Sequence, residues 1–431
     1  MLIQSSISVI LLGMIPFAGL LASLALFPLF ASRFWHAHFG KIAAGWSGVA
    51  IISLIQTTGP EATFHAILET FFHEYLSFII LIGSLYIVSG GILLDVRGRV
   101  SAKTNTFILG LGTVLAGWMG TTGAAMLMIR PLIRMNQGRA HQTHLMIFLI
   151  FLVANIGGAL TPLGDPPLFL GFLQGVHFFW PLEYLALETL LISSVLLGLF
   201  YMYDHRLLQQ ESLENETPKL TFQIQGWSNF GCLLGIISLV LMSGVWQPET
   251  SFSIQSVTIK LQDAVRDLGM VAIAIYSYLK TPASIHTKNQ FSWAPLSEVA
   301  KLFGGIFVTV IPVLLMLGTV PKELFSPREY FWLSGWLSAF LDNAPTYLVF
   351  FHMAGGDPGW LMTEGHLVLE AISLGAVFMG AMTYIGNAPN FMIKAMAEEN
   401  GIPMPTFLGY MKWSCGILLP LLLLLTFFHF C

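Results

Sequence analysis

Charge is the scarcest property of this 431-residue chain. Charged residues make up only 10% of the sequence and apolar residues 55%, whereas a soluble domain averages about 25% charged residues. This composition excludes an ordinary soluble domain and predicts an all-α polytopic membrane protein whose first partner is the lipid bilayer. A membrane-spanning helix needs about 20 mostly apolar residues. We expect such helices within residues 7–30, 42–58, 76–96, 104–119, 144–161, 181–203, 227–245, 264–279, 298–318, 365–384 and 406–430.

The sequence also lacks the motifs of an enzyme. Its three cysteines, Cys232, Cys415 and Cys431, are isolated and fit neither a disulfide framework nor a metal site. It contains no phosphate-binding loop, no ATP-binding domain and no zinc-type cluster of His and Cys. No basic run of the nucleic-acid-binding type is present either. We therefore expect no enzymatic activity, no cofactor and no nucleic-acid partner.

Lys and Arg in short loops predict the orientation in the membrane. Arg33 and Lys41 form one basic loop, and Arg97, Arg99 and Lys103 form a second. The loop between them, residues 59–75, carries three glutamates but no Lys or Arg. We expect the two basic loops in the cytoplasm and the N-terminus outside. The N-terminus has no basic region before its long apolar stretch, so it is expected to be a first span rather than a cleaved signal.

One motif occurs twice, in corresponding places of two apolar halves. Residues 158–167 read G-A-L-T-P-L-G-D-P-P and residues 380–389 read G-A-M-T-Y-I-G-N-A-P, an offset of 222 (380 − 158). The segments L-A-G-W-M-G-T-T-G-A from Leu115 and L-S-A-F-L-D-N-A-P-T from Leu337 keep the same offset (337 − 115 = 222). Paired interruptions of apolar helices indicate a transporter built from internal repeats.

The repeat divides the chain into two halves joined by a polar segment. We predict a first repeat over residues 1–203, a linker over 204–225 and a second repeat over 226–431. Within them we expect hairpins near 115–130 and 337–352, and broken helices near 158–167 and 380–389. A further polar stretch holds Asp263, Arg266 and Asp267 at helical spacing, where they are expected to pair with one another rather than form a transport site.

Gly and Pro inside the repeated motif remove backbone hydrogen bonds, which membrane proteins tolerate only in the protein interior or beside a water-filled cavity. The side chains there are acidic or neutral. Asp165 lies in the first motif, and its counterpart in the second is Asn387. Asp342 lies beside Asn343 in the second hairpin. Carboxylate, amide and hydroxyl oxygens suit a small hard cation such as sodium, and a buried carboxylate can exchange that cation for a proton.

The predicted cation and proton site comprises ten residues, with Asp165 and Asp342 as the sodium ligands. The neutral members are Thr121, Thr122, Asn155, Thr161, Asn343, Thr346, Thr383 and Asn387. Two alternatives stay open: either aspartate could instead cap a half-helix, and the neutral residues, with Asn390, could hold helices together.

Other polar residues are weaker candidates. His141 and His144 follow a basic stretch and are expected on a solvated face, and Glu188 is expected near the membrane interface with Glu183. His352 is a possible proton partner for the second hairpin. Lys394 is ambiguous, because it could end a half-helix or place a positive charge near the site.

These segments resemble the ion-transporter superfamily, and within it the NhaD-type sodium/proton antiporters, whose relatives are arsenite permeases and citrate or dicarboxylate carriers. The resemblance is carried by Asn155–Asp165, Ser338–Thr346 and Tyr75–Gly91. It implies inverted repeats, a transport domain that moves against a scaffold, and a homodimer. It also implies that Asp165 and Asp342 carry cation and proton, with Asn155, Thr161 and Asn343 beside them. One departure is the first hairpin, M-G-T-T-G-A, which lacks the acidic residue common there.

The sequence therefore predicts a secondary transporter that exchanges sodium or lithium for protons across a bacterial cytoplasmic membrane. Two alternatives remain: a sodium- or proton-coupled carrier of an anion such as citrate, a dicarboxylate or arsenite, and a passive channel. The anion carrier would have Lys or Arg facing its cavity.

Overall fold

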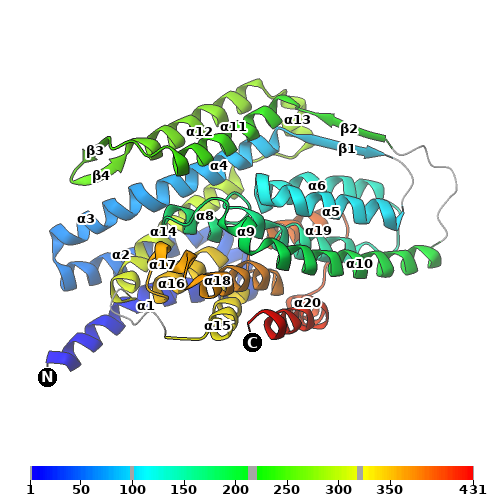
Figure 1. Cartoon of the computed structure of the whole chain (residues 1–431). Coiled ribbons are helices and arrows are strands. Elements are labelled where there is room, and N and C mark those ends of the chain that lie inside the picture. The colour runs from blue at the N-terminus through cyan, green and yellow to red at the C-terminus, as the bar shows by residue number, and fades with distance from the viewer. Residues whose placement is uncertain (1, 98–100, 212–220, 318–323, 431) are drawn as a thin grey trace.

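The computed structural model describes residues 2–97, 101–211, 221–317 and 324–430, and most of them lie in helices (Figure 1). The first half contains α1 (Leu2–Phe30), α2 (Ser32–Thr58), α3 (Pro60–Thr70), α4 (Leu76–Gly90), α5 (Ala102–Met119), α6 (Thr121–Met135), α7 (Thr143–Leu152), α8 (Pro166–Leu173), α9 (Trp180–Tyr184) and α10 (Ala186–Gln210). The second half contains α11 (Ser228–Val245), α12 (Leu261–Lys280), α13 (Ala283–Lys288), α14 (Ala294–Leu317), α15 (Pro327–Phe340), α16 (Asn343–Met353), α17 (Pro358–Met362), α18 (His366–Met379), α19 (Ala388–Glu399) and α20 (Phe407–His429).

Seven helices among the described residues are long and apolar enough to cross a membrane, which agrees with the predicted polytopic class. They are Ala37–Thr58, Pro60–Gly90, Thr143–Leu160, Ala186–Gln210, Ser228–Val245, Ala294–Leu317 and Phe407–His429. Gly13–Pro28 and His366–Met382 are shorter apolar helices. The expected span at 264–279 is not among the seven because α12 is amphipathic and begins with a charged cluster. The span expected at 365–384 is short because the chain unwinds after Met379.

The helices around the breaks recur at the same offset in the second half. Helices α6 and α16 begin 222 residues apart (343 − 121), and so do α8 and α19 (388 − 166). The short 3-10 turns η2 (Ile156–Leu160) and η3 (Gly380–Met382) precede α8 and α19. The repeat seen in two short motifs thus extends over the helices on both sides of them.

The hairpins α5–α6 and α15–α16 turn in different ways. Gly120 joins α5 to α6 with φ +83°, a conformation that favours glycine. Its counterpart is Asp342 (342 − 120 = 222), which has the ordinary φ of −64° and caps α16 by accepting a hydrogen bond from the Ala344 N–H at 3.1 Å. In the first hairpin, a glycine with positive φ therefore stands at the turn position that Asp342 occupies in the second hairpin.

Two small antiparallel ribbons, which the sequence had not predicted, complete the fold. In the first, β1 (Leu93–Arg97) pairs with β2 (Thr221–Gln225), so that Leu93 faces Gln225. In the second, β3 (Ser251–Ile254) pairs with β4 (Val257–Lys260). The predicted linker 204–225 thus contributes its end to a strand and its first seven residues to α10. The division of the chain into repeats at this segment stays a prediction.

The broken helices occupy the centre of the molecule. Nearly all of α7 and α18 is buried, whereas much of α10 and α20 is exposed. Helix α4 packs against α11 and α12 on one side, while α10 runs along the opposite side of α5 and α6 (Figure 1). At the start of α12, Arg266 donates to Asp263 and Asp267 at 2.9 and 2.8 Å, as the spacing of these residues predicted.

Candidate functional site

Both repeated motifs break a helix in the same way. Thr161 and Thr383 have extended backbones, with φ −147° and −137°, just after the 3-10 turns. Asp165 and Asn387 then take the N-cap positions of α8 and α19, with φ −128° and −152°. The predicted breaks are therefore present, and their conformations match across the repeat.

The two threonines tie each break to the neighbouring hairpin. The Thr161 hydroxyl donates to the Gly117 carbonyl at 2.5 Å and accepts from the Leu163 N–H at 3.1 Å. In the second half, Thr383 donates to the Ala339 carbonyl. Donor and acceptor are 44 residues apart in both halves (161 − 117 and 383 − 339). These hydroxyls satisfy carbonyls near the ends of α5 and α15, so their observed contacts are structural.

Asp165 is the centre of a cluster formed with Thr121, Asn343 and Asn387, called here the Asp165 cluster. Its Oδ1 accepts from Thr121 Oγ1 at 3.0 Å and from Asn387 Nδ2 at 3.1 Å, and its Oδ2 accepts from Asn343 Nδ2. Asp165 is only 1% exposed. Its side chain makes no capping bond to α8, so the capping alternative does not describe this aspartate.

The Asp165 cluster consists of two pairs of repeat counterparts. Asp165 corresponds to Asn387, and Thr121 corresponds to Asn343 (343 − 121 = 222). Asp165 and Asn387 thus meet directly although they belong to different copies of the repeated motif. The four residues also stand at the N-termini of α6, α8, α16 and α19, so four helix N-termini meet at one carboxylate.

Two further asparagines extend the cluster across the repeats. Asn387 Nδ2 also donates to the Ala154 carbonyl at 3.0 Å and lies 3.3 Å from Asn155 Oδ1. Asn155 Nδ2 donates to Asn390 Oδ1 at 2.8 Å, and Asn390 donates to the Gly380 and Thr383 carbonyls. Asn155 and Asn390 are fully buried and hold the two unwound segments together.

One acceptor at the centre is left without a donor. Asn343 is fully buried, and its Oδ1 has no hydrogen-bond partner among the described residues. An unsatisfied buried amide oxygen costs about 1–3 kcal/mol. Because the same side chain donates to Asp165, this oxygen is available to a ligand at the carboxylate.

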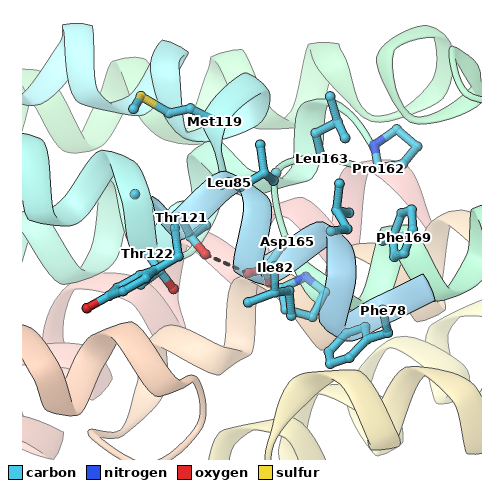
Figure 2. Close-up of a pocket in the computed structure, with 16 residues that line it drawn as sticks. Phe78, Ile82, Leu85, Met119, Thr121, Thr122, Pro162, Leu163, Asp165 and Phe169 are labelled. Carbon is cyan, nitrogen blue, oxygen red and sulfur yellow. Dashed lines mark hydrogen bonds between the residues drawn. The ribbon is translucent and has the colours of Figure 1, made fainter. Parts of the chain in front are cut away.

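A small cavity borders the Asp165 cluster. It has a volume of about 50 Å³ and is lined by Asp165, Thr121 and Thr122 together with apolar residues of α4 and of the first break. Figure 2 shows Asp165 and three of the α4 residues that line the cavity, Phe78, Ile82 and Leu85. A buried water needs about 10–15 Å³, so this cavity holds a few waters or a partly hydrated ion and excludes a tricarboxylate.

Asp342 and Thr346 make local contacts beside the cluster. Asp342 is half-buried and caps α16 through the Ala344 N–H, and Thr346 Oγ1 donates to the Asp342 carbonyl at 3.0 Å. Asp165 and Asp342, for which the sequence predicted the same role, thus make different contacts in the structure. Within the described ranges, no three His, Cys, Asp or Glu side chains gather as ligands for a metal ion.

The described contacts of His352 and Lys394 are to residues outside the Asp165 cluster. His352 ends α16, ten residues from Asp342, or about 15 Å along the helix, and its Nδ1 lies 2.9 Å from the Leu348 carbonyl. It is therefore not the proton partner considered above. Lys394 pairs with Glu398 at 2.8 Å. Arg130, the basic residue nearest to the first hairpin turn, donates to the Met126 and Asn289 carbonyls.

One prediction about exposure was wrong. His144 is buried in α7 rather than lying on a solvated face, and its Nε2 is 2.8 Å from Asp204 Oδ1. Glu188 is also buried, at the start of α10, and it is paired with His429. In both cases the partner lies on a distant part of the chain, which spacing does not reveal.

Asp204 is the centre of a second polar cluster, which the sequence placed in a linker. Its carboxylate accepts from Asn105 at 2.9 Å and from Arg139 at 2.8 Å, besides its contact with His144. Both Asp204 and the Arg139 side chain are fully buried. The only sequence signal was an acid within the apolar 25-residue helix that became α10.

We expect Asp204→Ala to lower the free energy of unfolding by about 3–5 kcal/mol, because it leaves the buried Arg139 without this partner. Thermal unfolding of the detergent-purified protein would measure the loss. The matched control is Glu211→Ala, which removes the other carboxylate of Arg139, 2.8 Å from its Nε, but keeps Asp204. A wild-type melting temperature for Asp204→Ala would contradict the importance of this cluster.

Fold and site together define a class: a multi-pass membrane protein with two broken helices that meet around a buried carboxylate, as in secondary transporters. The comparison with protein families agrees. The sequence model of a family described as "Putative citrate transport" matches residues 5–430. The chain belongs to this family and is a membrane transport protein. No curated protein matches the chain with significant similarity.

Proposed function

We propose that this protein is a cation-coupled carrier of a small carboxylate anion of the citrate class, and that Asp165 holds the coupling cation. The observation that supports it most is the Asp165 cluster. A fully buried carboxylate receives only uncharged donors, and Asn343 Oδ1 beside it is unpartnered. Buried carboxylates without basic partners are functional groups by default in membrane proteins.

The number of free acceptor positions supports a single coupling ion. Each carboxylate oxygen can accept about two hydrogen bonds. Among the described residues, Oδ1 of Asp165 accepts from Thr121 and Asn387, whereas Oδ2 accepts from Asn343 alone. Oδ2 and Asn343 Oδ1 are therefore the atoms that remain for a proton or a sodium ion. Hard oxygen ligands of this kind suit small cations.

The helix N-termini support an anionic substrate. The N-termini of α6, α8, α16 and α19 meet at the cluster, and each carries a partial positive charge of about half an elementary charge. The Thr161 and Thr383 hydroxyls meanwhile donate hydrogen bonds to carbonyls near the ends of α5 and α15. These bonds reduce the negative partial charge at the C-terminal ends of those two helices. This arrangement, with the family's description, favours an anion accompanied by a cation.

The cavity at Asp165 implies movement during transport. At about 50 Å³ it is too small for a tricarboxylate, so α4 has to move away from the first break before the substrate binds. Helix α4 packs against α11 and α12, which we propose as the scaffold, and also against α6 of the first hairpin. We further propose a homodimer in a bacterial cytoplasmic membrane, with the N-terminus outside.

The proposal is tested by uptake of radiolabelled citrate into proteoliposomes. We expect uptake that depends on an inward gradient of sodium or of protons and stops when both gradients are absent. Dicarboxylates should compete with citrate, and arsenite should not. Empty liposomes are the control. If citrate does not enter under any gradient, the substrate class is wrong.

Sodium/proton antiport is the second candidate. It is favoured by the surroundings of Asp165: none of the residues that line the cavity at this carboxylate is Lys or Arg, and the described contacts of Arg130 are to backbone carbonyls. Proteoliposomes with an acid interior and a fluorescent pH probe distinguish the two candidates. Collapse of the pH gradient on adding sodium without citrate would establish antiport; collapse only with citrate present would support the carrier.

Asp342 is expected to matter less than Asp165. Asn caps a helix about as well as Asp, so Asp342→Asn should keep the start of α16 and retain uptake within about threefold of wild type. Asp342→Ala should lose the cap and about 1 kcal/mol of stability. Uptake and thermal unfolding of both variants would measure this. Abolished uptake in Asp342→Asn at normal expression would make Asp342 a second cation-binding residue.

A further inference from the structure

A second group of titratable side chains lies outside the Asp165 cluster. Glu188 begins α10, His366 and Glu370 lie in the first turns of α18, and His429 ends α20. The two glutamates are buried, at 4% and 3% exposure. We call these four residues the His429 cluster. They join three helices from both halves of the chain, and α18 leads directly into the second break.

His429 bridges the two glutamates. Its Nε2 lies 2.6 Å from Glu370 Oε2, and its Nδ1 lies 3.2 Å from Glu188 Oε1. On the other side of Glu370, His366 Nδ1 lies 2.8 Å from Oε1. Each nitrogen of His429 thus faces a different carboxylate oxygen.

This geometry requires an additional proton. A neutral imidazole carries one N–H, and an ionised carboxylate only accepts hydrogen bonds. Both bridging contacts are therefore hydrogen bonds only if His429 is protonated or if one of the glutamates is. The remaining oxygen of Glu188, Oε2, is buried without a partner, so nothing else described neutralises that carboxylate.

The positions of His429 and Glu188 at helix ends favour a protonated His429 beside an ionised Glu188. His429 is in the last turn of α20 and Glu188 is in the first turn of α10, where a helix dipole stabilises a cation and an anion respectively. A metal ion fits the group poorly, because His429 directs its two nitrogens to separate carboxylates. The described residues likewise contain no set of three metal-ligating side chains around one point.

Few other ionisable groups face the cluster from the elements packed against it. The ring of Tyr184 on α9 is 5.6 Å from that of His366, and Glu183 beside it is exposed. The Glu329 carboxylate caps α15 through Ser326, and His352 is bonded within α16. These helices and those packed against them also carry the following ionisable residues: Lys103 on α5, His144 on α7, Asp204 on α10, Arg328 and Tyr330 on α15, Tyr347 on α16, and Tyr410 and Lys412 on α20.

We propose that the His429 cluster is a proton-binding site that latches α18 to α10 and α20, and that raising the pH opens it. When the proton leaves, two buried carboxylates face one neutral ring, and at least one contact is lost. The corresponding anchor of the first half does not depend on such a proton, because Arg139 holds Asp204 there at 2.8 Å. The latch is independent of which ion or anion the protein carries.

Thermal unfolding of the detergent-purified full-length protein between about pH 6 and about pH 9, where histidine titrates, tests the latch. We expect the wild-type melting temperature to fall by roughly 5 °C over this range. In His429→Gln, which cannot carry a proton, the fall should disappear, with a melting temperature near the wild-type value at high pH. The matched control is His141→Gln, because that side chain is exposed.

A second variant keeps the test decisive if His429→Gln does not fold. Glu188→Gln with Glu370→Gln removes both buried charges, so its melting temperature should be independent of pH and exceed that of wild type at about pH 9. The latch is wrong if the wild-type fall persists unchanged in either variant, or if His141→Gln abolishes it as well.

Discussion

Replacing Asp165 by Asn is expected to reduce citrate uptake at least about 100-fold while the protein still reaches the membrane. Asn keeps the size of the side chain but cannot balance the charge of a bound cation. A contact to a charged group contributes up to about 3 kcal/mol, which corresponds to about 100-fold, and a carrier that cannot bind its coupling ion loses coupled uptake as well. Folding should change little, because the partners of Asp165 are neutral. Uptake into proteoliposomes, normalised to the amount of folded protein, measures the effect.

The repeat provides a sharp control for this prediction. Asn387 is the counterpart of Asp165, has the same N-cap conformation and donates to it at 3.1 Å. In the double variant Asp165→Asn/Asn387→Asp, the carboxylate moves to the counterpart position in the second motif but stays within the cluster. We expect it to recover uptake to within about tenfold of wild type. Normal uptake by the single Asp165→Asn variant would show that the carboxylate does not bind the coupling ion.

The second large effect is expected from alanine at Gly164 and Gly386. A Cβ at Gly164 would lie 2.3 Å from the Gly158 carbonyl oxygen, and one at Gly386 would lie 2.5 Å from that of Gly380. Both neighbours are backbone, which cannot turn aside as a side chain does. We expect each substitution to cost about 3 kcal/mol or more and to abolish uptake. Thermal unfolding and the yield of folded protein measure it.

Gly198 and Gly416 are the matched controls. Each lies in a helix of the outer part, α10 or α20, and a Cβ there meets no atom within 4 Å. Alanine at these positions should be neutral or stabilise the helix by about 0.5–1 kcal/mol. If Gly164→Ala folds and melts like Gly198→Ala, the backbone at Gly164 does not pack as closely against the Gly158 carbonyl as the structure shows.

The fold was predictable wherever it depended on local pattern. Apolar length predicts most of the spans, and the motif around Thr161 and its counterpart around Thr383 predicts both breaks, because several Gly and Pro residues within ten positions weaken a helix strongly.

What the sequence could not supply were pairings between distant segments. From the sequence, Asp204 is part of a polar linker, and only the structure shows α5, α7 and α10 packed around it. Likewise, only the structure shows that His429 of α20 lies beside Glu188. The difference between Asp165 and Asp342 is of the same kind. Each precedes a helix, and only the three-dimensional arrangement shows that one caps its own helix while the other faces the opposite repeat.

The most direct test of the account is cation binding by the purified protein. Sodium would be titrated into wild type and Asp165→Asn in weakly buffered detergent solution, with heat and proton release recorded at several pH values. The account predicts that wild type binds a single cation in competition with a proton and that Asp165→Asn binds none. Equal sodium binding and proton release by the two proteins would contradict the assignment of the coupling ion to Asp165.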